Sequence, residues 1–259
     1  MTEDRQPHAA LDMRSRRLKG LKIERLLGLA ERRQPLRLLE VGTGSGGIAH
    51  YFATHPTLQC HVTAVDVVDQ RLIREGYDFH LVHDTALPFA DASFDVVLSN
   101  HVIEHVGERP AQLAHLRELR RVMAPDGVGY LAVPNRWMLI EPHYRLAFLS
   151  WLPRPLRSPY LRLMRRGERY DCEPLTVPRL ESLLAEAGFV WRHLEVEALR
   201  ATLDIEGAHG PGARLAALLP DLLLARARCA IPTLICRIGS QDSGLPGNAS
   251  VDPNGRPGI

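Results

Sequence analysis

Apolar residues recur along the chain in two alternating patterns. Short apolar runs, each long enough for one buried strand, are separated by segments in which apolar residues recur every three or four positions. The runs predict seven strands, at residues 36–41, 61–66, 79–83, 94–100, 128–133, 189–196 and 232–238. The segments predict helices at residues 11–33 (one helix or two short ones), 48–52, 111–123, 175–188 and 215–228. This alternation requires parallel pairing with right-handed crossovers, so we expect an α/β protein with a doubly wound, mostly parallel sheet.

The pattern changes after the fifth predicted strand. From Trp137 to Arg166, aromatic and aliphatic residues crowd the chain, and prolines divide it into short helical stretches. We interpret residues of about 137–170 and 205–230 as an inserted lid on a domain that spans residues 36–238. The remaining segments are residues 1–35, predicted to be a tail and a helix, and residues 239–259, whose Gly, Pro, Ser and Asn content predicts a disordered tail.

Composition narrows the class of protein. At 259 residues the chain suits one α/β domain with an insertion, and a formal charge of +2 gives no reason to expect nucleic acid as a partner. The four cysteines form no C-x-x-C pair, which argues against a structural zinc site or a disulfide framework. The first seventeen residues are polar and charged, and no apolar run reaches the ~18 residues of a membrane span. We therefore expect a cytoplasmic protein.

A glycine-rich turn follows the first predicted strand. Gly42, Gly44 and Gly47 satisfy G-x-G-x-x-G, and Gly46 adds a fourth glycine before the next helix. Glycine reaches positive φ and has no Cβ to hold a ligand away, so strand, turn and helix together present backbone N–H groups to a nucleotide. This pattern alone does not exclude a plain structural turn or a dinucleotide site.

Glu40, two residues before Gly42, separates these alternatives. The spacing E-x-G-x-G-x-G resembles the first motif of class I S-adenosylmethionine (SAM)-dependent methyltransferases. In that family the acid lies near the amino acid part of SAM, whose ammonium is cationic. A carboxylate at this point would give a pyrophosphate no favourable contact. The resemblance implies a Rossmann-like methyltransferase fold and a SAM site that includes Glu40, Gly42, Gly44 and Gly46.

A second acid ends the next strand. Asp66 lies about twenty residues beyond the glycines, where a doubly wound fold places a carboxylate that accepts hydrogen bonds from ribose hydroxyls. An Asp that caps the next helix is the alternative, and Asp69 could do the same. We expect Asp66, with Val67 beside it, to bind the ribose. Asn100, at the end of the predicted strand 94–100, should line the same cleft.

The segment from Asp84 to Asp95 carries the strongest resemblance. Small-molecule methyltransferases, including those of quinone biosynthesis, have an acid a few residues before Leu-Pro-Phe and then Phe-Asp at the start of the fourth strand. In that family the acid contacts the adenine amino group. The nearest match is Asp84, but its spacing to Leu87 is one residue short. His83, Asp84 or the Thr85 backbone is therefore expected to hold the adenine.

His101-Val-Ile-Glu-His105 has two readings. H-x-x-E-H is the inverzincin zinc motif. That reading leaves Glu40 and Asp66 unexplained, whereas Glu-His is common at this point in methyltransferases. Quinone O-methyltransferases have Glu where His101 stands, and divalent metal has been associated with that segment. We predict no metal ligands here, and a divalent metal is the less favoured reading. His143 and His101 are the candidate general bases, because a hydroxyl acceptor must lose a proton.

The predicted lid is rich in arginine and has no acid between Glu141 and Glu168. Its arginines are Arg145, Arg154, Arg157, Arg162, Arg165 and Arg166. The segment is either a cover for the acceptor pocket or an interfacial surface that lies on anionic lipid at the inner face of a membrane, and both can hold together. The acceptor is expected to be small and apolar, such as a lipid, quinone or polyketide, with a sugar as the alternative.

The resemblance, which covers residues of about 36–196, predicts SAM-dependent methyl transfer, with O-methylation favoured. Two other classes of function stay open at this stage. A nicotinamide-dependent oxidoreductase would use the glycine turn to hold pyrophosphate. A non-catalytic SAM-binding protein would need only the segment from Glu40 to Asp66.

Overall fold

Seven strands form one sheet in the order β3-β2-β1-β4-β5-β9-β8. The computed structural model describes residues 13–141, 143–207, 210–226 and 231–240, so both predicted tails lie almost wholly outside the described residues. The strands are β1 (Leu36–Val41), β2 (Cys60–Asp66), β3 (Asp78–Leu81), β4 (Phe94–Asn100), β5 (Met123–Pro134), β8 (Val190–His193) and β9 (Thr233–Gly239). Strand β9 pairs antiparallel with β5 and β8, and the remaining pairs are parallel. The predicted fold class is confirmed.

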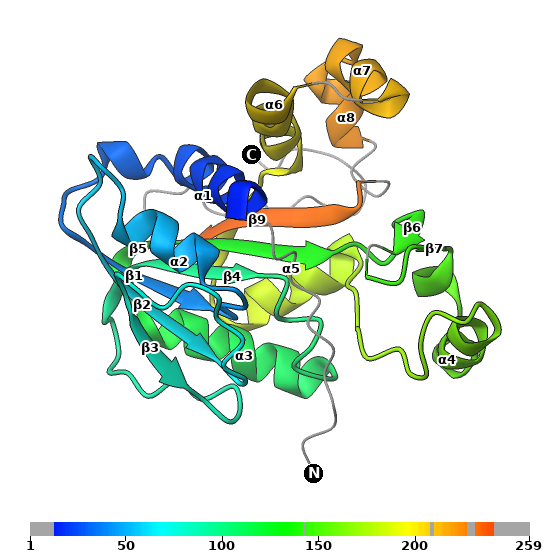
Figure 1. Ribbon diagram of the computed structural model, residues 1–259, viewed down its shortest axis with the longest axis horizontal. Helices are drawn as coiled ribbons and strands as arrows, with labels where there is room; N and C mark the ends of the chain where they lie inside the picture. Colours follow the sequence, from blue (N-terminus) through cyan, green and yellow to red (C-terminus); the bar gives the residue numbers. More distant parts are fainter. Residues whose placement is uncertain (1–12, 142, 208–209, 227–230, 241–259) are drawn as a thin grey trace, which may run out of the picture.

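Helices cover both faces of this sheet (Figure 1). On one face α1 (Met13–Leu27), α2 (Gly47–Ala53) and α6 (Glu195–Glu206) bury apolar side chains such as Ile23 and Phe52 against the strands. On the other face α3 (Arg109–Val122) and α5 (Val177–Glu186) contribute Leu116 and Leu183 to a second core. A short 3-10 helix, η1 (Leu29–Glu31), follows α1 because Gly28 adopts a left-handed conformation between them.

The chain order reverses between β1 and β4, which are neighbours in the sheet. Strand β1 leads outward to β2 and β3, whereas β4 leads the other way to β5. In an open α/β sheet, a crevice forms outside the carboxyl ends of the strands at such a reversal. The glycine turn follows β1 and the H-x-x-E-H segment follows β4, so the topology brings these two motifs together.

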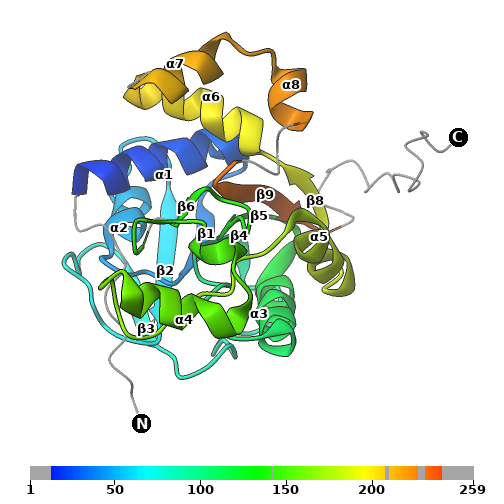
Figure 2. The same ribbon diagram turned by 90° about the vertical axis from the view of Figure 1, so that its right-hand side faces the viewer.

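The two ends of the predicted lid pair with each other beside the sheet, and we call this pairing the stem. After β5, Asn135 forms a bridge with Leu175, and the Arg136 N–H donates to the Leu175 carbonyl at 2.9 Å. Between these points lie β6 (Ile140–Glu141), β7 (Leu146–Ala147), the 3-10 helix η2 (Leu149–Trp151) and α4 (Arg154–Leu163). Figures 1 and 2 show this insertion beyond the carboxyl ends of the strands. It has a small core of its own, made of Leu146, Leu149 and Leu161.

The second predicted lid segment has a different position. Helices α7 (Pro211–Leu218) and α8 (Asp221–Arg226) contact α6 (Figure 2), and Arg200 of α6 donates to backbone carbonyls of residues 216 and 217 at 3.1 Å. Among the described residues, no helix is long and apolar enough to cross a membrane.

Two local predictions need correction, in the sixth strand and in the insertion. The sixth strand ends at His193 rather than residue 196, because Leu194 turns the chain into α6, a helix that the apolar run did not indicate. The zinc motif, which was the less favoured interpretation of residues 101–105, requires a helix, and these residues form turns and bends instead. In the insertion, the β6–β7 hairpin replaces the first of the expected short helices.

Candidate functional site

The glycine turn after β1 adopts a conformation that favours glycine. Gly42, Gly44 and Gly46 have φ values of 79°, 54° and 82°. A Cβ on Gly42 would lie 2.3 Å from Cγ2 of Val102, which follows β4. The Gly42 N–H donates to the Val65 carbonyl at 2.9 Å, which fixes the turn to β2. One side of the turn therefore packs closely against Val102 and β2, and its other side is available to a ligand.

Glu40 lies beneath this turn with its side chain almost wholly buried. Its Oε2 has no hydrogen-bond partner among the described residues. Burial raises the pKa of Glu40 to about 8, and the Ala49 backbone hydrogen bond and Arg16 of α1 offset this only in part. A buried carboxylate with an unpartnered oxygen is suited to a cationic ligand, because the cation would replace the lost hydration.

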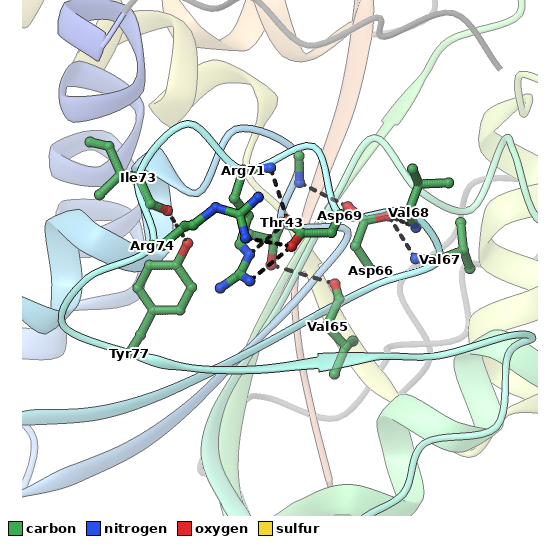
Figure 3. A network of polar contacts seen from close by, with 11 residues as sticks. Thr43, Val65, Asp66, Val67, Val68, Asp69, Arg71, Ile73, Arg74 and Tyr77 are labelled. Carbon is green, nitrogen blue, oxygen red and sulfur yellow. Dashed lines mark hydrogen bonds and ion pairs between the residues drawn. The ribbon is translucent and has the colours of Figure 1, made fainter. Parts of the chain in front are cut away.

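Asp66 is held by backbone N–H groups at the end of β2. Gly44 donates to its Oδ2 at 2.8 Å, and Val67 donates to its Oδ1 at 2.7 Å. These bonds fix the carboxylate beside the glycine turn (Figure 3), with lone pairs left for further donors. Asp69 differs, because it forms ion pairs with Arg71 and Arg74, each at 2.9 Å. The two acids thus differ: Asp66 lines the cavity, whereas Asp69 does not.

A cavity of about 1010 Å³ extends from these residues along the carboxyl ends of the strands. We call the part lined by Glu40, Gly42, Gly44, Asp66 and Val67, with His83, Asp84, Thr85 and Asn100, the cofactor end, after its expected ligand. The lining also includes His101, His105, His143 and Asp171. The ring centroids of His105 and His143 lie 5.8 Å apart, and we call this part the acceptor end. The volume is at the upper end of the usual range for ligand sites, so it can hold a nucleotide-sized cofactor and a second molecule.

The third loop supplies the part of the cavity expected for adenine. Asp84 accepts the Ala86 N–H at 2.8 Å through Oδ1, which orients its carboxyl group in the turn. Val82 and Leu87, both buried, form apolar walls beside it. His83, Asp84 and Thr85 all line the cavity, so the choice among them stays a prediction.

The end of β4 presents a polar group to the same space. Asn100 Oδ1 is buried without a hydrogen-bond partner in the described part of the chain. His101 follows with a φ of 60°, and its N–H donates to the Ala132 carbonyl at 2.9 Å. Its Nδ1 lies 3.2 Å from Oε1 of the fully buried Glu104. Burial would raise the pKa of Glu104, but the hydrogen bond with His101 and the nearby histidines lower it.

His143 reaches the cavity from the insertion. Its Nδ1 lies 2.7 Å from Oε1 of Glu141, and the Tyr144 N–H donates to Oε2 of that buried carboxylate at 2.8 Å. Burial acts to lower the pKa of His143, but the hydrogen bond with Glu141 and the charges of Glu141, Glu104 and Asp171 raise it. A carboxylate behind an imidazole fixes the ring and its tautomer, as in general-base pairs.

Residues 39–131 match the family described as "Methyltransferase domain", which spans the glycine turn, Asp66 and β4.

The chain therefore carries a methyltransferase domain at residues 39–131 and is similar to class I SAM-dependent methyltransferases.

Curated relatives of the chain include two O-methyltransferase types. It is 27% identical over 176 residues to a ubiquinone biosynthesis O-methyltransferase of Parvibaculum lavamentivorans, which covers 62% of this chain and 61% of the relative. It is 41% identical over 110 residues to a malonyl-[acyl-carrier protein] O-methyltransferase of Erwinia pyrifoliae, which covers 40% of this chain and 39% of the relative. The chain thus spans about three fifths or less of the length of these relatives.

Two solved structures share the fold. The [4+2]-cyclase SpnF aligns with a TM-score of 0.52 at 16% identity, over 92% of this chain and 85% of that chain. A chain from the complex of the Haloferax volcanii Trm112 methyltransferase activator with a methyltransferase also aligns with a TM-score of 0.52 at 16% identity, over 88% and 95%. At these identities the likeness shows the fold alone.

One residue of the expected SAM set, Gly46, lies outside the cavity lining. Gly46 precedes α2 as its N-cap and does not line the cavity. A Cβ there would lie 2.3 Å from the Ile73 carbonyl oxygen, so this glycine allows the loop after β2 to approach the turn.

Several cavity residues were not expected from the sequence. Arg16 of α1 lies near Glu40, and His105, Asp171 and the buried His115 line the acceptor end. Burial lowers the pKa of His115 to about 4, and its Nε2 lies 3.1 Å from the Ser99 hydroxyl. Only His105 carried a signal, as the second histidine of H-x-x-E-H. The others come from segments that no motif links to the turn.

Proposed function

We propose that this methyltransferase transfers the methyl group of SAM to a small, apolar acceptor, with an acceptor oxygen favoured as the nucleophile. One observation supports this most strongly. The glycine turn, Glu40 and Asp66 line one end of a single cavity, and the histidines His101 and His143 line the other. A sulfonium methyl is displaced in line and its thioether leaves as a neutral group, so the protein mainly has to align the reactants.

Each of the cofactor residues would contact a different part of the SAM molecule. The unpartnered Oε2 of Glu40 would take the cationic ammonium, and Asp66 would accept the ribose hydroxyls. Residues 83–85 would contact adenine between Val82 and Leu87. In this arrangement SAM supplies the electrophilic methyl, and the chain binds and orients it.

We assign the general base to His143, with His101 as the second candidate. Because Nδ1 of His143 contacts Glu141, we expect its other ring nitrogen, Nε2, to take the proton from an acceptor hydroxyl. His101 contacts Glu104 at a longer 3.2 Å through its own Nδ1. An acceptor that needs no deprotonation would use neither base.

The insertion supports an apolar acceptor and contact with a lipid surface. Its exposed apolar side chains are Trp137, Leu139, Ile140, Phe148, Trp151, Leu156, Leu163 and Met164. Arg162 and Arg165 are exposed in the same segment, and both would attract anionic headgroups. Arg154 and Arg157 do not contribute, because they pair with Glu173 at 2.6 Å and 3.6 Å. Fewer arginines are therefore available to lipid than the sequence indicated.

The other two classes of function have less support. A nicotinamide cofactor would place a pyrophosphate near the buried Glu40 carboxyl group, which offers an anion no favourable partner. A SAM-binding protein without activity would not need the Glu141–His143 pair at the far end of the cavity.

Calorimetry with SAM and with NADH tests the proposal. We expect SAM to bind and NADH not to bind. Asp66→Ala should weaken SAM binding by about tenfold or more, because a ribose hydroxyl loses a charged acceptor. Asp69→Ala is the matched control, since this neighbouring acid pairs with arginines instead. Equal affinities of the wild type and Asp66→Ala would contradict the assignment, and NADH binding would favour the oxidoreductase.

A further inference from the structure

Three potential metal ligands meet where the end of the insertion contacts the loop after β4. The buried Cys172 Sγ lies 3.9 Å from Nδ1 of His105 and 3.6 Å from Oδ1 of Asp171. All three ligand atoms lie within 4.8 Å of one another. His105 belongs to the loop between β4 and α3, whereas the other two residues end the insertion. The cluster therefore joins two segments that are far apart in the sequence.

These separations are close to those of a tetrahedral zinc site. Zinc binds thiolate sulfur at ~2.3 Å and imidazole nitrogen or carboxylate oxygen at ~2.0–2.1 Å. Two ligands at a tetrahedral angle are then ~3.5 Å apart, by the geometry of those bond lengths. The observed 3.6 Å and 3.9 Å need only small shifts to reach this value. The Tyr144 hydroxyl also donates to Asp171 Oδ1 at 3.2 Å.

A buried carboxylate, Glu104, lies behind the cluster on the far side of the His105 ring. Glu104 is fully buried and its Oε2 has no hydrogen-bond partner in the described residues. Its Oε1 lies 4.0 Å from Nε2 of His105, the ring nitrogen opposite the one near Cys172. Metal-bound histidines usually have a carboxylate on that second nitrogen, which orients the ring and increases its basicity.

We propose that His105, Asp171 and Cys172 bind one zinc ion, with Glu104 behind His105 as a positioning residue. Imidazole, carboxylate and thiolate together are a donor set that zinc accepts. Zinc uptake releases the thiol proton of Cys172 to solvent. His105 and Asp171 line the acceptor end of the cavity, so the fourth coordination position faces it and takes water or an oxygen of the acceptor. The ion would also hold the end of the insertion against the loop after β4.

Two further clusters occur among the described residues: Glu141, His143 and Cys172, which shares Cys172 with the proposed site, and His193, Glu195 and Cys236. We call the last of these the second cluster, and it provides an internal comparison. There both ring nitrogens of His193 contact carboxylates at 2.9 Å, and Glu195 Oε1 already accepts the Ile235 N–H at 3.2 Å. These groups satisfy one another without an ion. None of the three lines the cavity.

The test uses the full chain, stripped of metal by a chelator and then titrated with Zn²⁺ or Co²⁺. We expect one zinc per chain by calorimetry, and a thiolate-to-cobalt charge-transfer band with Co²⁺. Cys172→Ser should abolish the band and weaken zinc binding by at least about a hundredfold, because a direct ligand is lost. Asp171→Asn, an exposed position, should weaken zinc binding by at least about tenfold and serves if Cys172→Ser fails to fold.

Cys236→Ser is the matched control, since it removes a buried cysteine from the second cluster and should retain both the band and the stoichiometry. Absence of zinc binding by the wild type would overturn the proposal. So would loss of the site in Cys236→Ser, or equal affinities in wild type and Cys172→Ser. SAM affinity, measured on the same samples, reports separately on the proposed methyltransferase function.

Discussion

The two ends of the cavity are built in different ways. The cofactor end is positioned largely by backbone: Gly42 and Gly44 have positive φ, and the N–H groups of Gly44 and Val67 hold the Asp66 carboxylate. The acceptor end consists of side chains, among them His101 from the loop after β4 and His143 from the insertion. A backbone site is set by the sheet and changes little when surrounding side chains change. A side-chain site depends on how the insertion packs, so it can differ between proteins of the same fold.

A substitution at His143 should give the largest effect, because it changes the acceptor end and leaves the cofactor end intact. If His143 is the general base, His143→Ala should lower the methyl-transfer rate by ~10²-fold or more, because no group then accepts the hydroxyl proton. SAM affinity should stay unchanged, since the cofactor end does not include His143. Single-turnover kinetics and calorimetry on one sample measure both quantities. Near-normal turnover would transfer the role to His101, for which His101→Ala is the parallel variant.

Gly42→Ala should damage the cofactor end and so give the opposite result. The new Cβ would meet Val102 Cγ2 at 2.3 Å, and the residue would keep a φ of 79°. We expect SAM affinity to fall by at least about tenfold, in addition to ~1 kcal/mol of backbone strain. Gly188→Ala is the control, because its φ is 78° but nothing lies within 4 Å of the added Cβ. Equal effects of the two variants on SAM binding would show that close packing at the turn is unimportant.

The pKa of Glu40 gives the cofactor end a dependence on pH. With a pKa of about 8, Glu40 is mostly protonated in the free protein at pH 7, so binding of the SAM ammonium should release a proton. Calorimetry in two buffers of different ionisation enthalpy counts that proton. SAM affinity should rise as pH increases from about 5 to about 8.

Stability should change with pH in the opposite sense. The pKa of Glu40 in the folded protein exceeds its ordinary value of 4.5, so the free protein loses stability as pH rises from 4.5 to about 8. Glu40→Gln, which cannot ionise, should raise the melting temperature at pH 8 more than at pH 5.5 and abolish proton release. A wild type whose melting temperature does not respond to Glu40→Gln at pH 8 would contradict a buried, protonated carboxyl group.

The smallest expected effect concerns the outer surface of the acceptor end. Arg162 and Arg165 are exposed beside apolar side chains, and each could contribute ~1 kcal/mol to binding of anionic lipid. We expect co-sedimentation with phosphatidylglycerol vesicles at low salt that weakens at high salt. The double variant Arg162→Ala/Arg165→Ala should reduce it. If the protein stays in the supernatant at both salt concentrations, the insertion serves only as a cover for the acceptor pocket.

The difference between the two ends also explains what the sequence could predict. Strands, the glycine turn and Asp66 follow from short-range patterns, and all are present, although the sixth strand ends at His193. The ion pairs of Arg154 and Arg157 with Glu173 join residues sixteen or more positions apart, so no local pattern indicates them. The same holds for Cys172 beside His105, which the search for C-x-x-C spacing missed because one cysteine and one histidine come from different segments.

The stem that joins Asn135 to Leu175 has a consequence for how such enzymes diversify. Because both ends of the insertion meet at adjacent backbone positions, everything between them can be lengthened, shortened or exchanged without moving β5 or α5. Residues 136–174 therefore form a segment that can be exchanged as a unit. A chimera that carries the corresponding segment of another methyltransferase should accept a different substrate, while its cofactor site stays unchanged. Duplicated genes could follow the same route to new substrates.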